Sequence, residues 1–244
     1  MTAQPLPSPV LSPGRDAVDR AERRIRRALS DARAPAVTCS MQLGGIVLLD
    51  LLRRHTPSIP VIFVDTGYHF ADTIAFRDEL AEVWGLNMVV VSPATSVPAH
   101  EASLGILYES EPSRCCFLRK VAPADAALEG HDVWFAALRR QQTVSRRRLE
   151  PVEVQRLSSG APITKVSPLL DWTWADVDRY ATHRRLPRHP LYASGFTSIG
   201  CAPCTQPTFR SGEDRSGRWA ESSKTECGLH MIRGDALGGG GEDS

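Results

Sequence analysis

Six cysteines are the residues of this 244-residue chain most suited to chemistry, and four of them form two pairs. Cys201 and Cys204 form a Cys-x-x-Cys pair, and Cys115 and Cys116 are adjacent. The first spacing can direct two sulfurs at one metal site, but it also occurs in redox motifs. Adjacent cysteines can share a site only on a helix or a turn, because neighbouring strand side chains point to opposite faces. Four such thiolates suit a structural zinc ion or an iron–sulfur cluster, and buried packing or disulfides are the alternative.

The other two cysteines stand alone. Cys39 follows a short apolar segment, and we expect a buried structural role for it. Cys227 lies in a glycine-containing segment near the end of the chain. A free cysteine has a pKa of roughly 8.5, so only a few per cent is thiolate at neutral pH. Nearby cations raise that fraction, and Cys227 is therefore a candidate nucleophile.

Cationic residues that could bind an anion occur in three segments. Guanidinium groups suit phosphate and sulfate oxygens, although solvated charge is the alternative. Nucleic-acid binding is not favoured, because the 139–148 arginine cluster is short, lacks interleaved aromatic residues, and belongs to a chain with a net charge of +1. The candidates are Lys120 on the helical face of Cys116, Arg139 and Arg140 after the apolar segment 133–138, and Arg215 and Arg218 before Cys227.

Two turns that follow predicted strands are candidate nucleotide contacts. A strand at 36–40 and a helix at 46–52 flank a glycine-containing turn, where backbone N–H groups of Ser40, Gly44 and Gly45 could bind an anion. A plain tight turn is the alternative. The buried strand 61–64 ends in Asp65, Thr66 and Gly67, and ligands bind at the carboxyl ends of parallel strands. We therefore expect these three residues to line a nucleotide pocket.

Strands and helices alternate along the rest of the chain. We predict helices at 16–30, 73–84, 99–108 and 174–183, the last capped by Thr173, and strands at 87–91, 133–138 and 165–170. This alternation predicts an α/β fold with a doubly wound, mostly parallel sheet.

From Val37 to His230 the chain resembles the assimilatory adenylyl-sulfate reductases. The resemblance rests on Arg114-Cys115-Cys116-Phe117-Leu118-Arg119-Lys120-Val121, on Gly200-Cys201-Ala202-Pro203-Cys204 and on Glu226-Cys227-Gly228-Leu229-His230. It implies an adenine-nucleotide alpha-hydrolase-like fold and one [4Fe-4S] cluster on Cys115, Cys116, Cys201 and Cys204. It also implies that Cys227 attacks adenosine 5′-phosphosulfate (APS), that AMP and sulfite leave, and that thioredoxin is the reductant in sulfate assimilation.

The resemblance also implies roles for several substrate contacts. The turn at 65–68 and the Leu-Arg-Arg sequence at 138–140 match family motifs, Lys120 tunes the cluster, and His230 helps to position the tail. The phosphate loop departs from the family, because many members carry a glycine and an acidic pair where this chain has Gln42, Gly44 and Gly45. Three rivals stay open: a reductase for the 3′-phosphorylated nucleotide (PAPS) or for both nucleotides, an ATP pyrophosphatase, and a non-catalytic zinc-binding module.

The expected organisation is one nucleotide- and cluster-binding domain with tails. Residues 1–14 are proline-rich and predicted to be disordered, 15–208 form the α/β domain, 209–235 a mobile catalytic tail, and 236–244 a flexible end. The chain has no apolar run of membrane-spanning length, and its first residues do not resemble a secretory signal. We therefore expect a cytoplasmic protein without a membrane or nucleic-acid partner. A homo-oligomer is compatible with the sequence.

Overall fold

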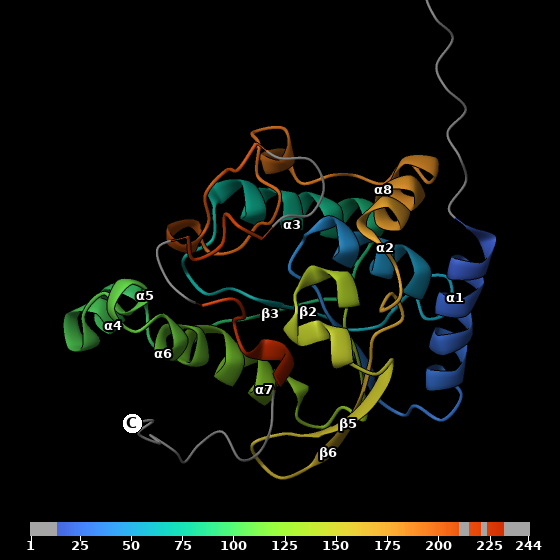
Figure 1. The fold of residues 1–244 in the computed structure, drawn as a ribbon. Helices are drawn as coiled ribbons and strands as arrows, with labels where there is room; N and C mark the ends of the chain where they lie inside the picture. Colours follow the sequence, from blue (N-terminus) through green and yellow to red (C-terminus); the bar gives the residue numbers. More distant parts are fainter. Residues whose placement is uncertain (1–13, 210–214, 221–223, 232–244) are drawn as a thin grey trace, which may run out of the picture.

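The computed structural model describes residues 14–209, 215–220 and 224–231, which build one six-stranded sheet with helices on both faces (Figure 1). The strand order is β3-β2-β1-β4-β6-β5. Neighbouring strands run parallel, except that β5 runs antiparallel to β6. The predicted doubly wound, mostly parallel α/β fold is therefore confirmed. The strands are β1 (Pro35–Thr38), β2 (Val61–Val64), β3 (Met88–Val91), β4 (Val133–Phe135), β5 (Val152–Arg156) and β6 (Pro162–Val166).

Two apolar clusters cover the two faces of the sheet, because successive strand side chains point to opposite faces. In β2, Val61 and Phe63 belong to the larger cluster, whereas Ile62 and Val64 belong to the smaller one. The larger cluster contains residues of α1, α2, α3 and α8, and the smaller one contains residues of α7. Figure 1 shows α4–α7 on the opposite side of the sheet from α2, α3 and α8. The helices are α1 (Arg15–Leu29), α2 (Leu43–Leu52), α3 (Ala71–Trp84), α4 (Val97–Leu104), α5 (Leu107–Ser110), α6 (Pro112–Cys116), α7 (Ala122–Leu128) and α8 (Trp174–His183).

The chain reverses its progress across the sheet between β1 and β4. From β1 it proceeds outward through β2 to β3, and it then returns to place β4 on the other side of β1. The connections that leave β1 and β4 therefore diverge, and a crevice forms beyond the carboxyl ends of these two strands. In folds of this type such a crevice is the place where ligands bind.

Several predicted elements are confirmed, and others need correction. The strand at 61–64 and the helix at 174–183 have the predicted bounds, and the Thr173 hydroxyl accepts a 3.1 Å hydrogen bond from the N–H of Asp176. The single helix predicted at 99–108 is wrong, because Gly105 takes a left-handed φ of +74° and separates α4 from α5. The last predicted strand covers Pro162–Val166 rather than 165–170.

Strand β5 was not predicted from the sequence. It lies at the edge of the sheet, and its side chains alternate between exposed and half-buried. Val152 and Val154 are 53% and 73% exposed, so the strand lacks the continuous apolar run of the central strands. Such a strand is defined by its pairing with β6 rather than by its own pattern.

The tandem cysteines and the tail meet on the face of the sheet covered by α7. Cys115 and Cys116 end α6, and a π-helical turn, η1 (Phe117–Val121), leads into α7. The short 3-10 helices are η2 (Arg140–Gln142), η3 (Ser145–Arg148), η4 (Pro190–Tyr192), η5 (Ala202–Cys204) and η6 (Leu229–Met231), and η6 contacts η1. No helix in the described part of the chain is long and apolar enough to cross a membrane. Of the predicted tail at 1–14, residues 1–13 lie outside the described residues, as does the whole predicted tail at 236–244.

Candidate active site

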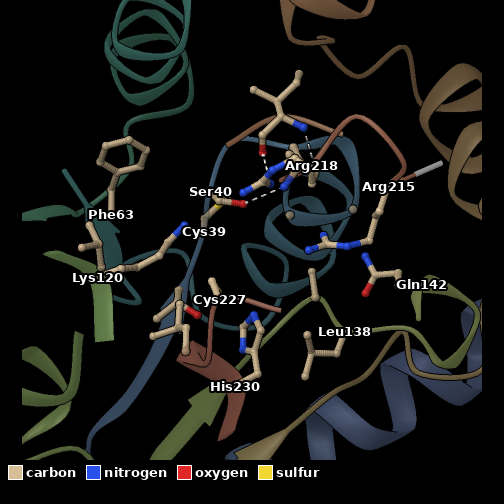
Figure 2. A pocket seen from close by; sticks show the side chains of 18 of the residues that line it. Cys39, Ser40, Phe63, Lys120, Leu138, Gln142, Arg215, Arg218, Cys227 and His230 are labelled. Carbon is tan, nitrogen blue, oxygen red and sulfur yellow. Dashed lines mark hydrogen bonds between the residues drawn. The ribbon is translucent and has the colours of Figure 1, made fainter. Parts of the chain in front are cut away.

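A cavity lies in the crevice between the ends of β1 and β4 (Figure 2). Residues that follow these strands line it, together with the end of β2, and the tail closes it with Cys227, Leu229 and His230. The described tail therefore lies against the site that the topology of the sheet creates. The lining includes Thr38 and Phe63 of the sheet, and Cys39, Ser40, Ala137 and Leu138 just beyond the ends of β1 and β4.

The cavity is cationic. Lys120, Arg146, Arg215 and Arg218 line it, and no Asp or Glu does so among the described residues. Figure 2 shows the Lys120 side chain reaching the cavity from one segment of the chain and the Arg215 and Arg218 side chains from another. Such a set of cations without a carboxylate suits a ligand with several negative charges.

Several buried nitrogen atoms around the cavity have no hydrogen-bond partner among the residues that the structure describes. They include Nε of Arg215, Nε of Arg218 and Nδ1 of His230. A buried polar group without a partner costs free energy, so such groups mark places where a ligand or a water molecule completes the hydrogen bonding. Two of these nitrogens belong to guanidinium groups, which again indicates an anion.

The loop after β1 forms one wall of the cavity. Ser40, Gly44 and Gly45 line it as predicted, but Gly44 and Gly45 lie in the first turn of α2 rather than in a loop before it. Gln42 ties this loop to the segment before Cys201, because its side-chain oxygen accepts a 3.1 Å hydrogen bond from the N–H of Ile199. The atypical residue Gln42 thus connects the nucleotide side of the site to the cysteine loop.

Cys39 and Gly45 are in close contact beside the cavity. Cys39 is 5% exposed, and burial raises the pKa of its thiol to about 12. A Cβ atom at Gly45 would lie 2.7 Å from the Cys39 sulfur, so the helix can approach the strand end only because residue 45 has no side chain. Cys39 is therefore a buried thiol, as expected from the sequence, and not a nucleophile.

Cys227 also lines the cavity (Figure 2). Burial opposes its ionisation, but the Lys120 ammonium, the N–H of Leu229 and the Arg218 guanidinium hold its pKa below the ordinary value. The thiolate fraction at neutral pH is therefore higher than for a free cysteine.

A second, smaller cavity contains the four paired cysteines. Cys115 and Cys116 line it from α6, and Cys201 and Cys204 line it from the loop around η5. Cys227 and Lys120 line both cavities, so the two cavities adjoin at these residues. The structure thus brings together the two cysteine pairs, which lie far apart in the sequence.

The thiols of this second cavity influence one another electrostatically. Burial and the nearby Cys201 and Cys204 raise the pKa of Cys115 to about 11. Burial and Cys227 raise the pKa of Cys116 to about 12. Several thiols that raise one another's pKa favour a bound cation or cluster that stabilises the thiolate forms.

Five cysteines line this cavity, together with the hydroxyl-bearing residues Thr66, Tyr68 and Tyr108. The described lining contains cysteines but no His, Asp or Glu. The described residues also contain no group of three or more His, Cys, Asp or Glu that could hold a metal ion. Around one zinc ion four sulfurs must converge on a point, whereas each cysteine of a four-iron cluster binds a different iron. The thiols of the two pairs are ligands of the type that either group requires.

Five predicted substrate contacts do not line the main cavity. The Arg139 side chain is buried and lies 5.7 Å from the Trp174 ring, and Arg140 bonds Asp171 and the Leu149 carbonyl. Thr66 lines the cysteine cavity, and its hydroxyl lies 3.3 Å from the Cys201 sulfur. The other two are Asp65 and Gly67. Within the turn, the N–H of Gly67 donates a hydrogen bond to the Asp65 carboxylate.

The structure adds cavity residues that sequence reasoning missed. Arg146 lines the cavity in place of Arg139 and Arg140, because the chain turns through η2 and η3 before presenting its guanidinium group. Its presence in the arginine cluster was a signal, but the turn that selects it was not readable from the sequence. Trp219 lines both cavities, and the Arg218 guanidinium lies 4.5 Å from its ring.

The fold and the position of the site define a class of protein, the α/β domains with a ligand site at the switch point of a parallel sheet. The chain belongs to the phosphoadenosine phosphosulfate reductase domain family, whose sequence profile matches residues 34–207. The tail with Cys227 lies beyond the matched residues.

Relatives and solved structures agree with this membership. The chain is 41% identical over 194 residues to adenosine 5′-phosphosulfate reductase 1 of Bacillus subtilis (strain 168), covering 79% of this chain and 82% of the relative. It is 40% identical over 195 residues to an adenosine 5′-phosphosulfate reductase of Geobacillus kaustophilus (strain HTA426), with the same coverage.

Two solved structures show the same fold. The phosphoadenylyl-sulfate (PAPS) reductase of Candida auris, in a phosphate complex, matches with a TM-score of 0.67 and 25% identity, over 80% of this chain and 99% of that one. The FMN adenylyltransferase of Candida glabrata, in complex with FMN and an ATP analogue, matches with a TM-score of 0.58 and 17% identity, over 79% and 65% of the two chains. The second likeness concerns the fold alone.

Proposed function

We propose that this protein reduces adenosine 5′-phosphosulfate to sulfite and AMP, with Cys227 as the nucleophile. The main support is that the Cys227 thiol faces a cavity lined by four cationic side chains and, among the described residues, by no carboxylate. This cavity lies at the nucleotide-binding edge of the sheet, and curated relatives at about 40% identity carry this activity in their names.

The first step is attack of the Cys227 thiolate on the sulfur of the sulfate group. A bond forms between the two sulfur atoms, and the bond from this sulfur to the bridging oxygen of AMP breaks. AMP leaves with the bonding electron pair, and a cysteine S-sulfonate stays on the protein. Lys120, Arg215 and Arg218 neutralise the phosphate and sulfate oxygens and stabilise the departing AMP.

The second step needs an external dithiol, and we propose thioredoxin for this role. One of its thiolates attacks the sulfur of Cys227, and sulfite leaves with the electron pair. The second thiol of the reductant then displaces the Cys227 thiolate from the mixed disulfide. The dithiol is thereby oxidised to a disulfide, and the two electrons that it loses reduce the sulfur of sulfate to that of sulfite.

We further propose a [4Fe-4S] cluster in the cysteine cavity, held by Cys115, Cys116, Cys201 and Cys204. The position of both cysteine pairs in one cavity supports a thiolate-bound group, and the resemblance to the adenylyl-sulfate reductases favours a cluster over the zinc alternative. When bound, the cluster supplies charge and polarisation beside the anion site. Lys120 lines both cavities and lies between the two sites.

The test is sulfite formation from adenosine 5′-phosphosulfate with a thiol reductant, comparing the parent protein with Cys227→Ser. We expect the variant to lose turnover and to keep the visible absorption of an iron–sulfur cluster. Mass spectrometry of the parent, incubated with substrate and no reductant, should show one added sulfonate on Cys227. Absence of this adduct, or loss of the cluster in the variant, contradicts the division of roles between Cys227 and the other four cysteines.

The 3′-phosphorylated nucleotide is the alternative substrate, and the Candida auris structure belongs to an enzyme named for it. The four cysteines in two pairs favour the unphosphorylated substrate, because reductases of the 3′-phosphorylated nucleotide commonly lack these pairs. Comparison of kcat/KM for the two nucleotides decides the question. A clear preference for the 3′-phosphate overturns the proposed substrate but leaves the chemistry of Cys227 unchanged.

A further inference from the structure

Glu226 and Cys227 are adjacent residues of the tail, and their side chains lie in different surroundings. Cys227 lines both cavities, whereas Glu226 lines neither. The Glu226 carboxylate instead contacts residues of the η2–η3 region, which follows β4. Gly228 follows with a left-handed φ of +84° and turns the chain into η6, where Leu229 joins the smaller apolar cluster.

The contact between Glu226 and Arg146 is bidentate. Nε of Arg146 donates to Oε1 at 2.7 Å, and Nη2 donates to Oε2 at 2.7 Å. The Thr143 hydroxyl donates a third hydrogen bond, of 2.8 Å, to Oε1. Two parallel charge-assisted hydrogen bonds fix both the position and the orientation of a carboxylate.

This ion pair is shielded from solvent. The Arg146 side chain is 9% exposed and the Glu226 side chain 19%. Burial opposes ionisation, but the hydrogen bonds and the positive charges of Arg146 and Arg215 keep the pKa of Glu226 below its ordinary value. The carboxylate is therefore charged at neutral pH, and removing its charge leaves a buried guanidinium group without its counterion.

Arg146 differs from Arg215 and Arg218 in the hydrogen bonding of its guanidinium group. Its Nη1 donates to the Gln142 side chain, so all three nitrogens of its guanidinium group have partners within the protein. Within the described residues, Nε of Arg215 and Nε of Arg218 are buried and have no hydrogen-bond partner, although Nη2 of Arg215 lies 3.9 Å from Oε2 of Glu226. Arg146 is thus already engaged by the tail, while other arginines retain hydrogen-bonding capacity for an incoming anion.

We propose that Glu226 is a positioning residue whose contact with Arg146 and Thr143 docks the tail before substrate binds, with Cys227 facing the anion cavity. The catalytic consequence of this docking rests on the function proposed above. The docking itself does not depend on that function, because every group in the contact belongs to this chain.

The test measures the accessibility of Cys227 in the cluster-loaded protein without substrate. Iodoacetamide labels the protein, and mass spectrometry follows the peptide that contains Cys227. Because Glu226 also raises the pKa of Cys227, rates are compared at their high-pH plateau, where the thiol is fully ionised. We expect Glu226→Gln to raise the plateau rate about tenfold, equivalent to about 1.4 kcal/mol. Thr143→Val should raise it by a smaller factor.

Glu22→Gln is the matched control. The Glu22 carboxylate also joins two arginines, Arg54 at 3.2 Å and Arg26 at 3.3 Å, and its side chain is 23% exposed. It lies on α1, away from the tail. We expect the control to label at the rate of the parent. Equal plateau rates for parent and Glu226→Gln, or an equal increase in the control, overturn the proposal.

A second measurement separates positioning from loss of structure. With reductant withheld, Glu226→Gln should form the Cys227 S-sulfonate about tenfold more slowly than the parent. Release of sulfite from the preformed adduct by a small dithiol should not slow. If both steps slow together with loss of cluster absorption, the role is structural and the proposal fails. If the parent forms no adduct, the proposed function fails, and the labelling rates still decide the role of Glu226.

Discussion

The ammonium group of Lys165 donates a 2.8 Å hydrogen bond to the main-chain carbonyl of His230. The Lys165 side chain is fully buried, and Glu153 is its ion-pair partner at 3.4 Å. The His230 ring stacks on Trp134, with centroids 5.8 Å apart and an interplanar angle of 21°. A cation from β6 and an aromatic ring from β4 thus bind the end of the described tail to the sheet.

Lys165→Met should weaken this docking. The His230 carbonyl would retain the Gln155 amide at 3.4 Å, so we expect a loss of about 1–2 kcal/mol. Hydrogen exchange measured by mass spectrometry should become roughly tenfold faster in residues 224–231. Arg156→Met is the control, because Arg156 donates a hydrogen bond to the carbonyl of Gly160 rather than to the tail. Unchanged protection in Lys165→Met would mean that other contacts hold the tail.

Lys120→Met should shift the pH dependence of Cys227. After burial, which acts in the opposite direction, the Lys120 ammonium is the largest influence on this thiol, and it lowers the pKa. Removing the ammonium raises the pKa, so the rise of the alkylation rate with pH should move to higher pH. The rate in the variant should be lower at neutral pH and approach that of the parent in alkaline solution. A profile that does not move would assign the low pKa to another group, and the absorption spectrum checks that the cluster is intact.

Gly45→Ala should destabilise the fold, whereas Gly44→Ala should not. A Cβ atom at residue 45 would lie 2.7 Å from the Cys39 sulfur, and overpacking of this kind costs about 1–3 kcal/mol. At residue 44 the nearest atom would be 3.9 Å away, and alanine is favoured over glycine within a helix by about 0.5–1 kcal/mol. Thermal unfolding measures both effects. Cys39→Ala should restore much of the stability of Gly45→Ala, and failure to do so would place the strain elsewhere.

Replacement of a cysteine from either pair should remove the proposed cluster, whereas replacement of Cys39 or Cys227 should not. We expect Cys115→Ser and Cys201→Ser to lose the iron, the acid-labile sulfide and the visible absorption of anaerobically purified protein. Cys39→Ser and Cys227→Ser should retain all three. Bound zinc without sulfide in the parent would contradict the cluster and support the zinc alternative.

The sequence by itself determined the local elements and the identity of the reactive groups. The apolar segment at 61–64 and the Thr173 cap specify their strand and helix through short-range patterns, and the structure confirms both. The paired cysteines and the single Cys227 were identified by type and spacing, which do not depend on the fold. The family resemblance connected these segments to adenylyl-sulfate chemistry.

Only the tertiary structure decided which cations meet Cys227. Lys120, Arg146 and the pair Arg215 and Arg218 come from three separate segments, and their convergence depends on β4 crossing to the other side of β1. The same holds for the contact of Glu226 with Arg146, two residues 80 positions apart. Periodicity and propensity report on neighbours within a few residues, whereas strand order and the turns through η2 and η3 are set by long-range packing. The sequence therefore identified the reactive groups, and the tertiary structure determined which side chains surround them.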